Sequence, residues 1–279
     1  MPAQIDARQR PRGGRTGLLY ITIPGGAVRG SLCDDEMVEA KLSCDQCPVR
    51  HRSLCAALTS EELARLSQIA RQRTIVAGQV ILSDNETPDY FANVMAGLVK
   101  LTKTLPDGRQ QIVGLQFQSD FIGRPFGIRS PYFAEAATDV QLCCYPKRLF
   151  EALLRDFPGL QHRLFEHTLD ELDAAREWML LLGRKTAAEK VASFLLMIAR
   201  RMIQADCRPH EVVRFELPLS RAEMGDYLGL TIETVSRQIT RLRALDMIEV
   251  ESGGRSFSVP DLERLERAAQ MGGAAFALS

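Results

Sequence analysis

The sequence predicts an α+β fold in which a β-roll is followed by a long helix and a C-terminal winged helix-turn-helix. Three observations lead to this prediction: short strand-like segments between residues 74 and 145, a sustained helical period after Pro158, and two capped helices joined by a glycine turn. The predicted divisions are a poorly ordered tail (1–43), a cysteine-bearing β-roll (44–157), a long helix (158–183), a winged helix-turn-helix domain (184–270) and a second tail (271–279).

The composition permits two compact cores and argues against several classes of protein. The chain has 279 residues, of which 46% are hydrophobic, and its 35 Lys and Arg residues balance 35 Asp and Glu residues. This balance argues against diffuse nucleic-acid binding but is compatible with a single basic helix. No run of about 18 apolar residues exists, so no membrane span is expected. Because nothing before the cysteines resembles a secretion signal, we expect a cytoplasmic protein, with Met37 as an alternative translation start.

The first half of the chain is predicted to form a short helix and then a series of strands. Thr59 or Ser60 can cap a helix that runs to about Arg71. Turn residues then separate short apolar stretches, two of which flank Pro106-Asp107-Gly108 and are predicted to form a hairpin. Strands at this spacing indicate a β-roll or barrel. The predicted strands are Val80–Leu82, Phe91–Met95, Leu98–Thr104, Gln111–Phe117 and Val140–Tyr145.

The pattern after Pro146 predicts a short helix, Arg148–Leu154, and a long helix from Pro158 to about Leu182. Apolar side chains on the long helix recur with spacings of four, three and seven residues, as in a parallel coiled-coil seam. The seam predicts a homodimer; the alternative is that the same stripe packs on the β-roll of its own chain. The predicted dimerisation residues are Phe165, Leu169, Leu172 and Met179.

A helix-turn-helix is predicted near the C-terminus. Ser220 and Glu223 fit a capping box, and Gly229 suits the left-handed backbone of a sharp turn. Thr231 can cap the second helix. The predicted elements are the helices Ala187–Met202, Arg221–Leu228 and Ile232–Leu245, and a hairpin wing of Ile248–Glu251 and Ser256–Val259.

Polar side chains near the start of the second of these helices suit the reading of DNA. Glu233, Ser236 and Arg237 fall at i, i+3 and i+4 and therefore project from one face. An arginine can bond guanine bidentately, a glutamate can accept from cytosine, and a serine can bond a base or a phosphate. Arg241 is better placed for phosphate. Double-stranded DNA is therefore the expected partner; the alternative is an ordinary solvated amphipathic helix.

Three cysteines lie close together at Cys44, Cys47 and Cys55, and the adjacent pair Cys143–Cys144 follows much later. In a reducing compartment, cysteines grouped in this way favour a metal site over disulfides. Three close thiolates and a remote fourth can hold either an iron–sulfur cluster or a tetrahedral zinc ion, and the spacing alone does not separate the two.

Three segments resemble the FNR branch of the cyclic-AMP receptor protein (CRP/FNR) family of transcriptional regulators. They are Cys-Asp-Gln-Cys-Pro-Val-Arg-His-Arg-Ser-Leu-Cys (44–55), Trp-Met-Leu-Leu-Leu-Gly-Arg-Lys (178–185) and Tyr-Leu-Gly-Leu-Thr-Ile-Glu-Thr-Val-Ser-Arg (227–237). The resemblance implies a β-roll sensor domain and an oxygen-labile [4Fe–4S] cluster whose intact form favours the dimer. It also implies that Glu233, Ser236 and Arg237 read palindromic sites of the TTGAT type, with RNA polymerase as a further partner.

The chain departs from the FNR pattern in the spacing of its cysteines. Seven residues separate Cys47 from Cys55, where many FNR proteins have five. Counting back from Pro146, Cys143 matches the family's fourth ligand, and Cys144 is the alternative because neighbouring residues of a strand face opposite sides. A zinc-stabilised or thiol-based regulator of the same family, with a different signal, remains the alternative reading of these cysteines.

Two further functions are not favoured by the sequence. Nucleotide-binding relatives carry a glutamate where this chain has Arg124, and residues 130–135 lack an arginine for the cyclic phosphate, so no cyclic nucleotide is expected. Enzyme motifs such as a Walker loop are absent, and so is the cysteine spacing of ferredoxins and radical enzymes. An iron–sulfur enzyme or electron carrier is therefore a remote alternative, and we expect no catalytic residues.

Overall fold

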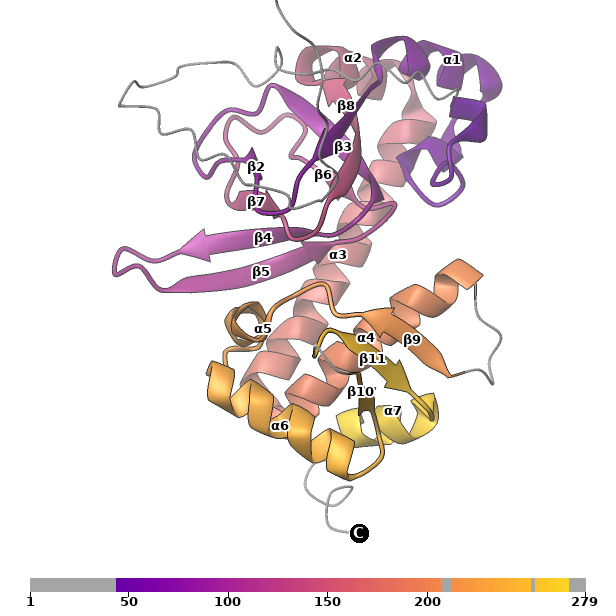
Figure 1. Ribbon diagram of the computed structural model, residues 1–279. Coiled ribbons are helices and arrows are strands. Elements are labelled where there is room, and N and C mark those ends of the chain that lie inside the picture. Colours follow the sequence, from indigo (N-terminus) through magenta and orange to yellow (C-terminus); the bar gives the residue numbers. More distant parts are fainter. Residues whose placement is uncertain (1–43, 207–211, 252–253, 271–279) are drawn as a thin grey trace, which may run out of the picture. The chain divides into compact units, whose positions relative to one another are not determined.

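The computed structural model describes residues 44–206, 212–251 and 254–270 (Figure 1). The two predicted tails and Met37 lie outside these residues. None of the helices within them combines the length and the apolar character needed to cross a bilayer. The fold is α+β, as predicted, with a β-roll, a long helix and a C-terminal helix-turn-helix.

Two 3-10 turns and one helix precede the roll. The turns η1 (Cys44–Gln46) and η2 (Leu54–Ala57) carry cysteines, and helix α1 (Ser60–Ile69) follows. Thr59 caps α1 in a full capping box with Glu62. The predicted end of this helix was wrong, because Arg71 already pairs with β8 as the first residue of strand β1.

Eight strands form two four-stranded antiparallel sheets, ordered β1-β8-β3-β6 and β2-β7-β4-β5 (Figure 1). The five strands predicted from the sequence are confirmed to within one residue at each end. Strands β1, β6 and β7 escaped prediction, because they are short or lack a clear apolar alternation. The strands are β1 (Arg71–Ile75), β2 (Val80–Leu82), β3 (Tyr90–Ala96), β4 (Val99–Thr104), β5 (Gln110–Gln116), β6 (Phe121–Ile122), β7 (Phe133–Ala136) and β8 (Val140–Pro146).

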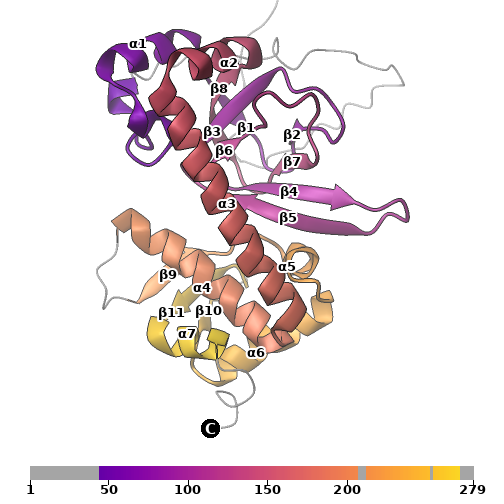
Figure 2. The same cartoon turned by 180° about the vertical axis from the view of Figure 1, so that it is seen from behind.

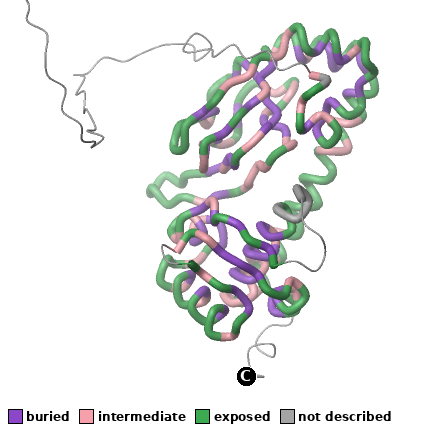
Figure 3. The backbone as a smooth tube through the Cα atoms, turned by 45° about the vertical axis from the view of Figure 1, so that its right-hand side comes forward, coloured by how far each residue is buried: buried purple, intermediate pink, exposed green. Residues whose placement is uncertain are grey.

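The roll has two apolar cores, because successive residues of its first sheet are buried on both faces, as along β3 from Tyr90 to Met95; the buried stretches of the chain are purple in Figure 3. One core joins the inner faces of the two sheets and includes Val94, Val99 and Leu142. The other includes Phe91 and Tyr145 of the first sheet together with side chains of η2, α1, α2 and α3. The turns that carry the N-terminal cysteines are thereby fixed to the outer face of β3 and β8.

Helix α2 (Lys147–Asp156) is followed by α3 (Pro158–Arg184), which is continuous over 27 residues (Figures 1 and 2). Proline occupies the first turn of α3, where its missing N–H costs nothing. Both helices were predicted. The start of α3 packs against η2, and an added Cβ at Gly159 would lie 3.3 Å from the carbonyl oxygen of Ala57. The cysteine-bearing turn therefore rests directly on the base of the long helix.

The C-terminal part contains a three-stranded sheet, ordered β10-β11-β9, and four helices. Strand β9 and helix α7 were not predicted; β9 extends the expected two-stranded wing. Leu98 and Ile112 of the roll lie in the same apolar core as these elements. The elements are α4 (Ala187–Asp206), β9 (Val213–Glu216), α5 (Arg221–Leu228), α6 (Ile232–Ala244), β10 (Glu249–Val250), β11 (Ser256–Val259) and α7 (Leu262–Gln270).

Candidate metal centre and nucleic-acid interface

Successive turns fold the N-terminal cysteine segment compactly. The amide of Cys47 donates to the carbonyl of Cys44 at 3.4 Å, and the amide of Ser53 donates to the carbonyl of Val49 at 3.0 Å. Val49 and Leu54 are each 2% exposed and anchor the segment. The seven residues between Cys47 and Cys55 are thus taken up by turns, and the longer spacing does not separate the two cysteines.

Strand β8 separates the two adjacent cysteines. Val140, Leu142 and Cys144 belong to the core inside the roll, whereas Cys143 packs against the outer core. Cys143 is paired with Asn93 of β3 and Gln72 of β1. This alternation follows from the two-residue period of a strand.

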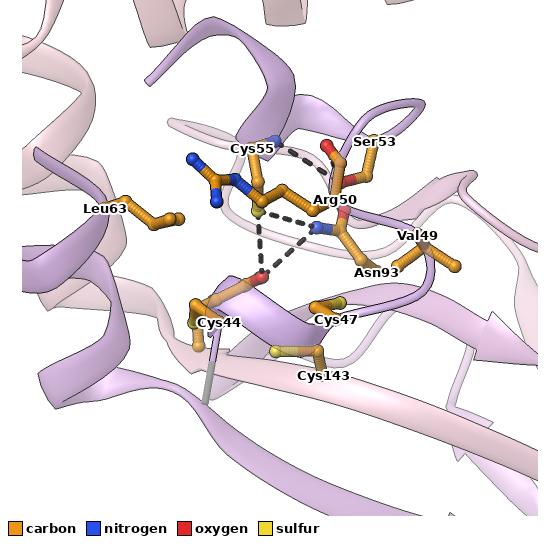
Figure 4. Close-up of a pocket in the computed structure, with 10 residues that line it drawn as sticks. Cys44, Cys47, Val49, Arg50, Ser53, Cys55, Leu63, Asn93 and Cys143 are labelled. Carbon is orange, nitrogen blue, oxygen red and sulfur yellow. Dashed lines mark hydrogen bonds between the residues drawn. The ribbon is translucent and has the colours of Figure 1, made fainter. Parts of the chain in front are cut away.

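Four cysteines line one pocket, which we call the four-cysteine pocket (Figure 4). Its members are Cys44, Cys47, Cys55 and Cys143, and the other lining residues are Val49, Arg50, Ser53, Leu63, Asn93 and Tyr145. Its atom-free space is about 280 Å³ when the part open to solvent is counted. Within the described residues, no three His, Cys, Asp or Glu side chains are arranged to hold a single metal ion.

The thiols of this pocket are in an environment that disfavours bare thiolates. Burial raises the pKa of Cys55, although hydrogen bonds with Ser53 and Tyr145 oppose the effect. Burial also raises the pKa of Cys143 strongly, and the neighbouring Cys55 and Cys144 raise it further. Without a cation both groups are therefore neutral thiols at neutral pH, and a bound metal would be needed to hold them as thiolates.

A buried polar pair lies at the base of the pocket. Asn93 and Tyr145 are each 2% exposed. The amide Nδ2 of Asn93 donates to the Tyr145 hydroxyl at 3.1 Å and to Cys55 Sγ at 3.7 Å. Asn93 Oδ1 has no hydrogen-bond partner among the described residues. The sequence analysis missed both residues; the one available signal was an asparagine within an otherwise apolar strand.

The helix-turn-helix has the predicted caps. Ser220 and Glu223 form the capping box of α5, and Gly229 has φ 63° and ψ 43°, a left-handed conformation suited to glycine. Thr231 accepts a hydrogen bond from the amide of Thr234 at the start of α6. Gly225 was not predicted as part of this turn; an added Cβ there would lie 2.6 Å from the carbonyl oxygen of Leu230. A side chain there would push the turn away from α5.

Helix α6 presents the predicted reading residues to solvent. Val235, Ile239 and Leu242 are buried and hold the helix to its domain. The residues predicted to contact DNA, which are Glu233, Ser236, Arg237 and Arg241, are all exposed. Hydrogen bonds in the first turn, including one with Thr231, lower the pKa of Glu233, so its carboxylate is ionised at neutral pH.

The apolar stripe of α3 is exposed on the single chain. Phe165, Leu169, Leu172 and Met179 are between 45% and 70% exposed, and Leu180, also apolar, is 53% exposed. These values rule out the alternative in which the stripe packs on its own roll. Large apolar side chains in one row on a long helix are typical of a surface that a partner covers.

Two family models match the chain. Residues 189–268 match a Crp-like helix-turn-helix domain, and residues 72–157 match a cyclic nucleotide-binding domain. Together they span the roll and the C-terminal domain.

The chain is similar to named transcriptional regulators of other bacteria. A probable transcriptional activator of Rhizobium leguminosarum bv. viciae is 49% identical over 226 residues, which are 81% of this chain and 92% of that protein. The transcriptional activator protein FnrL of Cereibacter sphaeroides is 49% identical over 223 residues, or 80% of this chain and 90% of that protein. Among solved structures, FixK2 from Bradyrhizobium japonicum is 32% identical with a TM-score of 0.64, covering 72% of this chain and 97% of that one.

Proposed function

Because this chain belongs to the CRP/FNR family of DNA-binding transcriptional regulators, we propose that it senses oxygen through a [4Fe–4S] cluster in the four-cysteine pocket. Members of the family are regulators rather than enzymes, and they act as dimers that bind DNA through the helix-turn-helix. The proposal adds the cofactor, the signal and the DNA sequence to that general role.

The gathering of four thiols around one space is the observation that carries the proposal. A zinc ion with Zn–S distances of about 2.3 Å would require its four sulfurs to lie within about 4 Å of one another. Ligands of a four-iron cluster sit around a cube, so they are spread more widely. Four thiols around one pocket can serve either group, and the resemblance of residues 44–55 to FNR proteins favours the cluster.

When bound, the cluster would supply positive charge that holds the buried thiols as thiolates and links two distant parts of the chain. Cys55 lies in η2, which packs on the base of α3, and Cys143 lies on β8 of the roll. Ligation would hold η2 in place against α3. Loss of the ligation in air would free η2 and weaken the support of the dimer helix. We propose this as the switch between the dimeric, DNA-binding form and an inactive form.

The exposed face of α6 supports a specific set of DNA contacts. We assign Arg237 to a guanine, Glu233 to a cytosine and Ser236 to a base or phosphate within half-sites of the TTGAT type. Arg241 is assigned to phosphate, where it fixes register. The two-fold axis of the dimer would place two such helices about one DNA turn apart on a palindrome. RNA polymerase is the proposed partner at the promoter.

Cyclic nucleotide is not part of the proposed mechanism. Arg124 is exposed at the position where nucleotide-binding relatives have a glutamate. The side chain of Tyr132 packs against the inner core of the roll, and burial raises its pKa to about 12. An apolar, tyrosine-filled interior offers little to an anionic ligand.

The test is an absorption spectrum with iron and sulfide analysis of anaerobically purified full-length protein, repeated after exposure to air. We expect a broad band at about 420 nm, about four irons per chain, and bleaching in air. Tight operator binding should be lost with the band, as measured by titration of a labelled TTGAT palindrome. A colourless protein containing one zinc per chain would overturn the proposal and leave a regulator with another signal.

A further inference from the structure

The polar atoms of Asn93 and Tyr145, beneath the four-cysteine pocket, are not required for packing. Strand β3 is buried from Tyr90 to Met95, and every member except Asn93 is apolar or aromatic. An apolar residue at position 93 would fill the same space without leaving Oδ1 unpaired. A buried polar atom without a partner costs about 1–3 kcal/mol, so its presence calls for a compensating role.

The positions of Asn93 and Tyr145 follow from the register of the first sheet. Tyr145 lies two residues after Cys143 on β8 and therefore faces the same side. Asn93 is the direct partner of Cys143 on β3. Both residues line the four-cysteine pocket, and the amide of Asn93 is directed toward Cys55 (Figure 4). The sheet thus presents a cysteine, a phenol and an amide to the same space.

The donors can be assigned by counting hydrogens. The Asn93 amide has two N–H groups, and the structure directs Nδ2 to Cys55 Sγ and to the Tyr145 oxygen. The phenol oxygen is thereby occupied as an acceptor, and its single O–H remains to be donated. Its sulfur neighbours are Cys55, whose Sγ lies 3.7 Å away, and Cys143, whose pKa the hydroxyl acts to lower. A thiolate can only accept, so the amide of Asn93 donates to Cys55, and the single O–H of Tyr145 is donated to one of its two sulfur neighbours.

We infer that Asn93 and Tyr145 are positioning residues that donate hydrogen bonds to the thiolates of Cys55 and Cys143 and so slow the oxidation of the cluster by dioxygen. The inference rests on the proposed function. Hydrogen bonds to cluster sulfurs stabilise the more negative redox state and raise the reduction potential. Transfer of one electron from cluster to dioxygen, which yields superoxide, becomes less favourable. Removing the donors should therefore make the cluster more labile in air.

Tyr145→Phe is the direct test, because it removes the O–H and keeps the ring. Tyr90→Phe is the matched control, since Tyr90 is a buried tyrosine of the same sheet whose hydroxyl donates to the carbonyl of Ile81. We expect Tyr145→Phe to assemble the cluster anaerobically, to show a lower midpoint potential, and to bleach about tenfold faster in air. The control should match the wild type in both measurements.

Asn93→Leu separates this role from a structural one, and keeps the test open if Tyr145→Phe does not fold. Leucine has the same number and branching of side-chain heavy atoms and removes the unpaired oxygen, so the unfolding midpoint of the metal-free protein should be unchanged or higher. Bleaching in air should nevertheless be faster. A variant that lost both stability and cluster to the same degree would indicate a packing role only and overturn the inference.

The outcomes distinguish this inference from the function on which it rests. A wild-type protein without the absorption band would overturn the proposed function itself. A wild-type protein with the band, and variants with the same potential and bleaching rate, would overturn only the assignment of Asn93 and Tyr145.

Discussion

Two adjacent cysteines of β8 have opposite surroundings, and substitutions at each should separate their roles. Cys143 lines the four-cysteine pocket, whereas Cys144 is 4% exposed inside the roll. We predict that Cys143→Ser loses most of the bound iron, while Cys144→Ala keeps it. The second variant should instead lower the free energy of unfolding by about 1–2 kcal/mol, because it leaves a small cavity. Iron analysis and urea unfolding measure the two effects, and the reverse pattern would make Cys144 the ligand.

Arginines on α6 are expected to differ in what they contribute to DNA binding. Arg237→Ala should weaken binding by about 1–3 kcal/mol on operators that keep the guanine and have little effect on others. Arg243, which is also exposed but lies near the end of the helix, is the comparison. Arg243→Ala should weaken binding on all sequences and reduce the salt slope by about one. Fluorescence anisotropy with specific and random duplexes measures both, and equal weakening by Arg237→Ala on both duplexes would contradict base reading.

Single site residues could be predicted from the sequence where several residues of one chemical type lie close together. The N-terminal cysteines could be chosen because three of one rare residue type lie within twelve positions. Asn93 and Tyr145 could not, since each is an isolated polar residue in a strand and their contact joins positions 52 apart. Only the register of β3 and β8 brings them to the cysteines.

The exposed stripe of α3 gives the element-scale prediction. Leu172→Lys should weaken the dimer by about 2 kcal/mol, or roughly thirtyfold in its dissociation constant, because a charge would be buried in the seam. Ala174→Lys adds the same charge about half a turn away and four residues after Asp170, a favourable spacing. It should leave the dimer intact. Analytical ultracentrifugation at several concentrations measures the dimer dissociation constant of both variants. Equal dissociation constants would show that the interface lies on another face of the helix.

Helices were easier to predict than strands for a physical reason. The predicted helices of the C-terminal domain have start and stop signals in their own sequence, such as the capping box at Ser220 and the glycine at position 229. Short strands such as β6, with two residues, and β9, with four, have no residues that mark their ends in the way that caps mark a helix. They are strands because neighbours elsewhere in the chain pair with them, so their identity depends on the assembled sheet.

For the whole molecule, Lys100 connects the roll to the helix-turn-helix. Its ammonium lies 2.8 Å from Glu135 of β7 and 2.7 Å from Glu223 of α5. Burial opposes charge on Glu223, but hydrogen bonds from Lys100 and Ser220 prevail and lower its pKa. A carboxyl with a lowered pKa contributes stability that is present at neutral pH and is lost as the pH falls through its folded-state pKa.

We therefore predict that Lys100→Met lowers the free energy of unfolding by about 1–3 kcal/mol at pH 7. The difference from the wild type should shrink as the pH falls below the ordinary pKa of glutamate, about 4.3. Lys103→Met is the control, since Lys103 lies on the same strand and pairs with Asp84 while 47% exposed. Its effect should be below about 1 kcal/mol. A loss for Lys100→Met that persists unchanged to pH 3 would exclude the ion pairs as its cause.

Leu98 and Ile112 belong to the roll in sequence but to the core of the C-terminal domain in packing. Together with the hydrogen bond from Gln111 to the carbonyl of Tyr227, they make the β4–β5 hairpin a structural part of both halves. The two halves are therefore poor interchangeable modules. A chimaera that joins residues 184–270 to another sensor domain would expose the apolar surface that Leu98 and Ile112 cover, unless the β4–β5 hairpin were transferred as well. The practical unit of exchange, in engineering as in recombination between related genes, is the helix-turn-helix plus this hairpin.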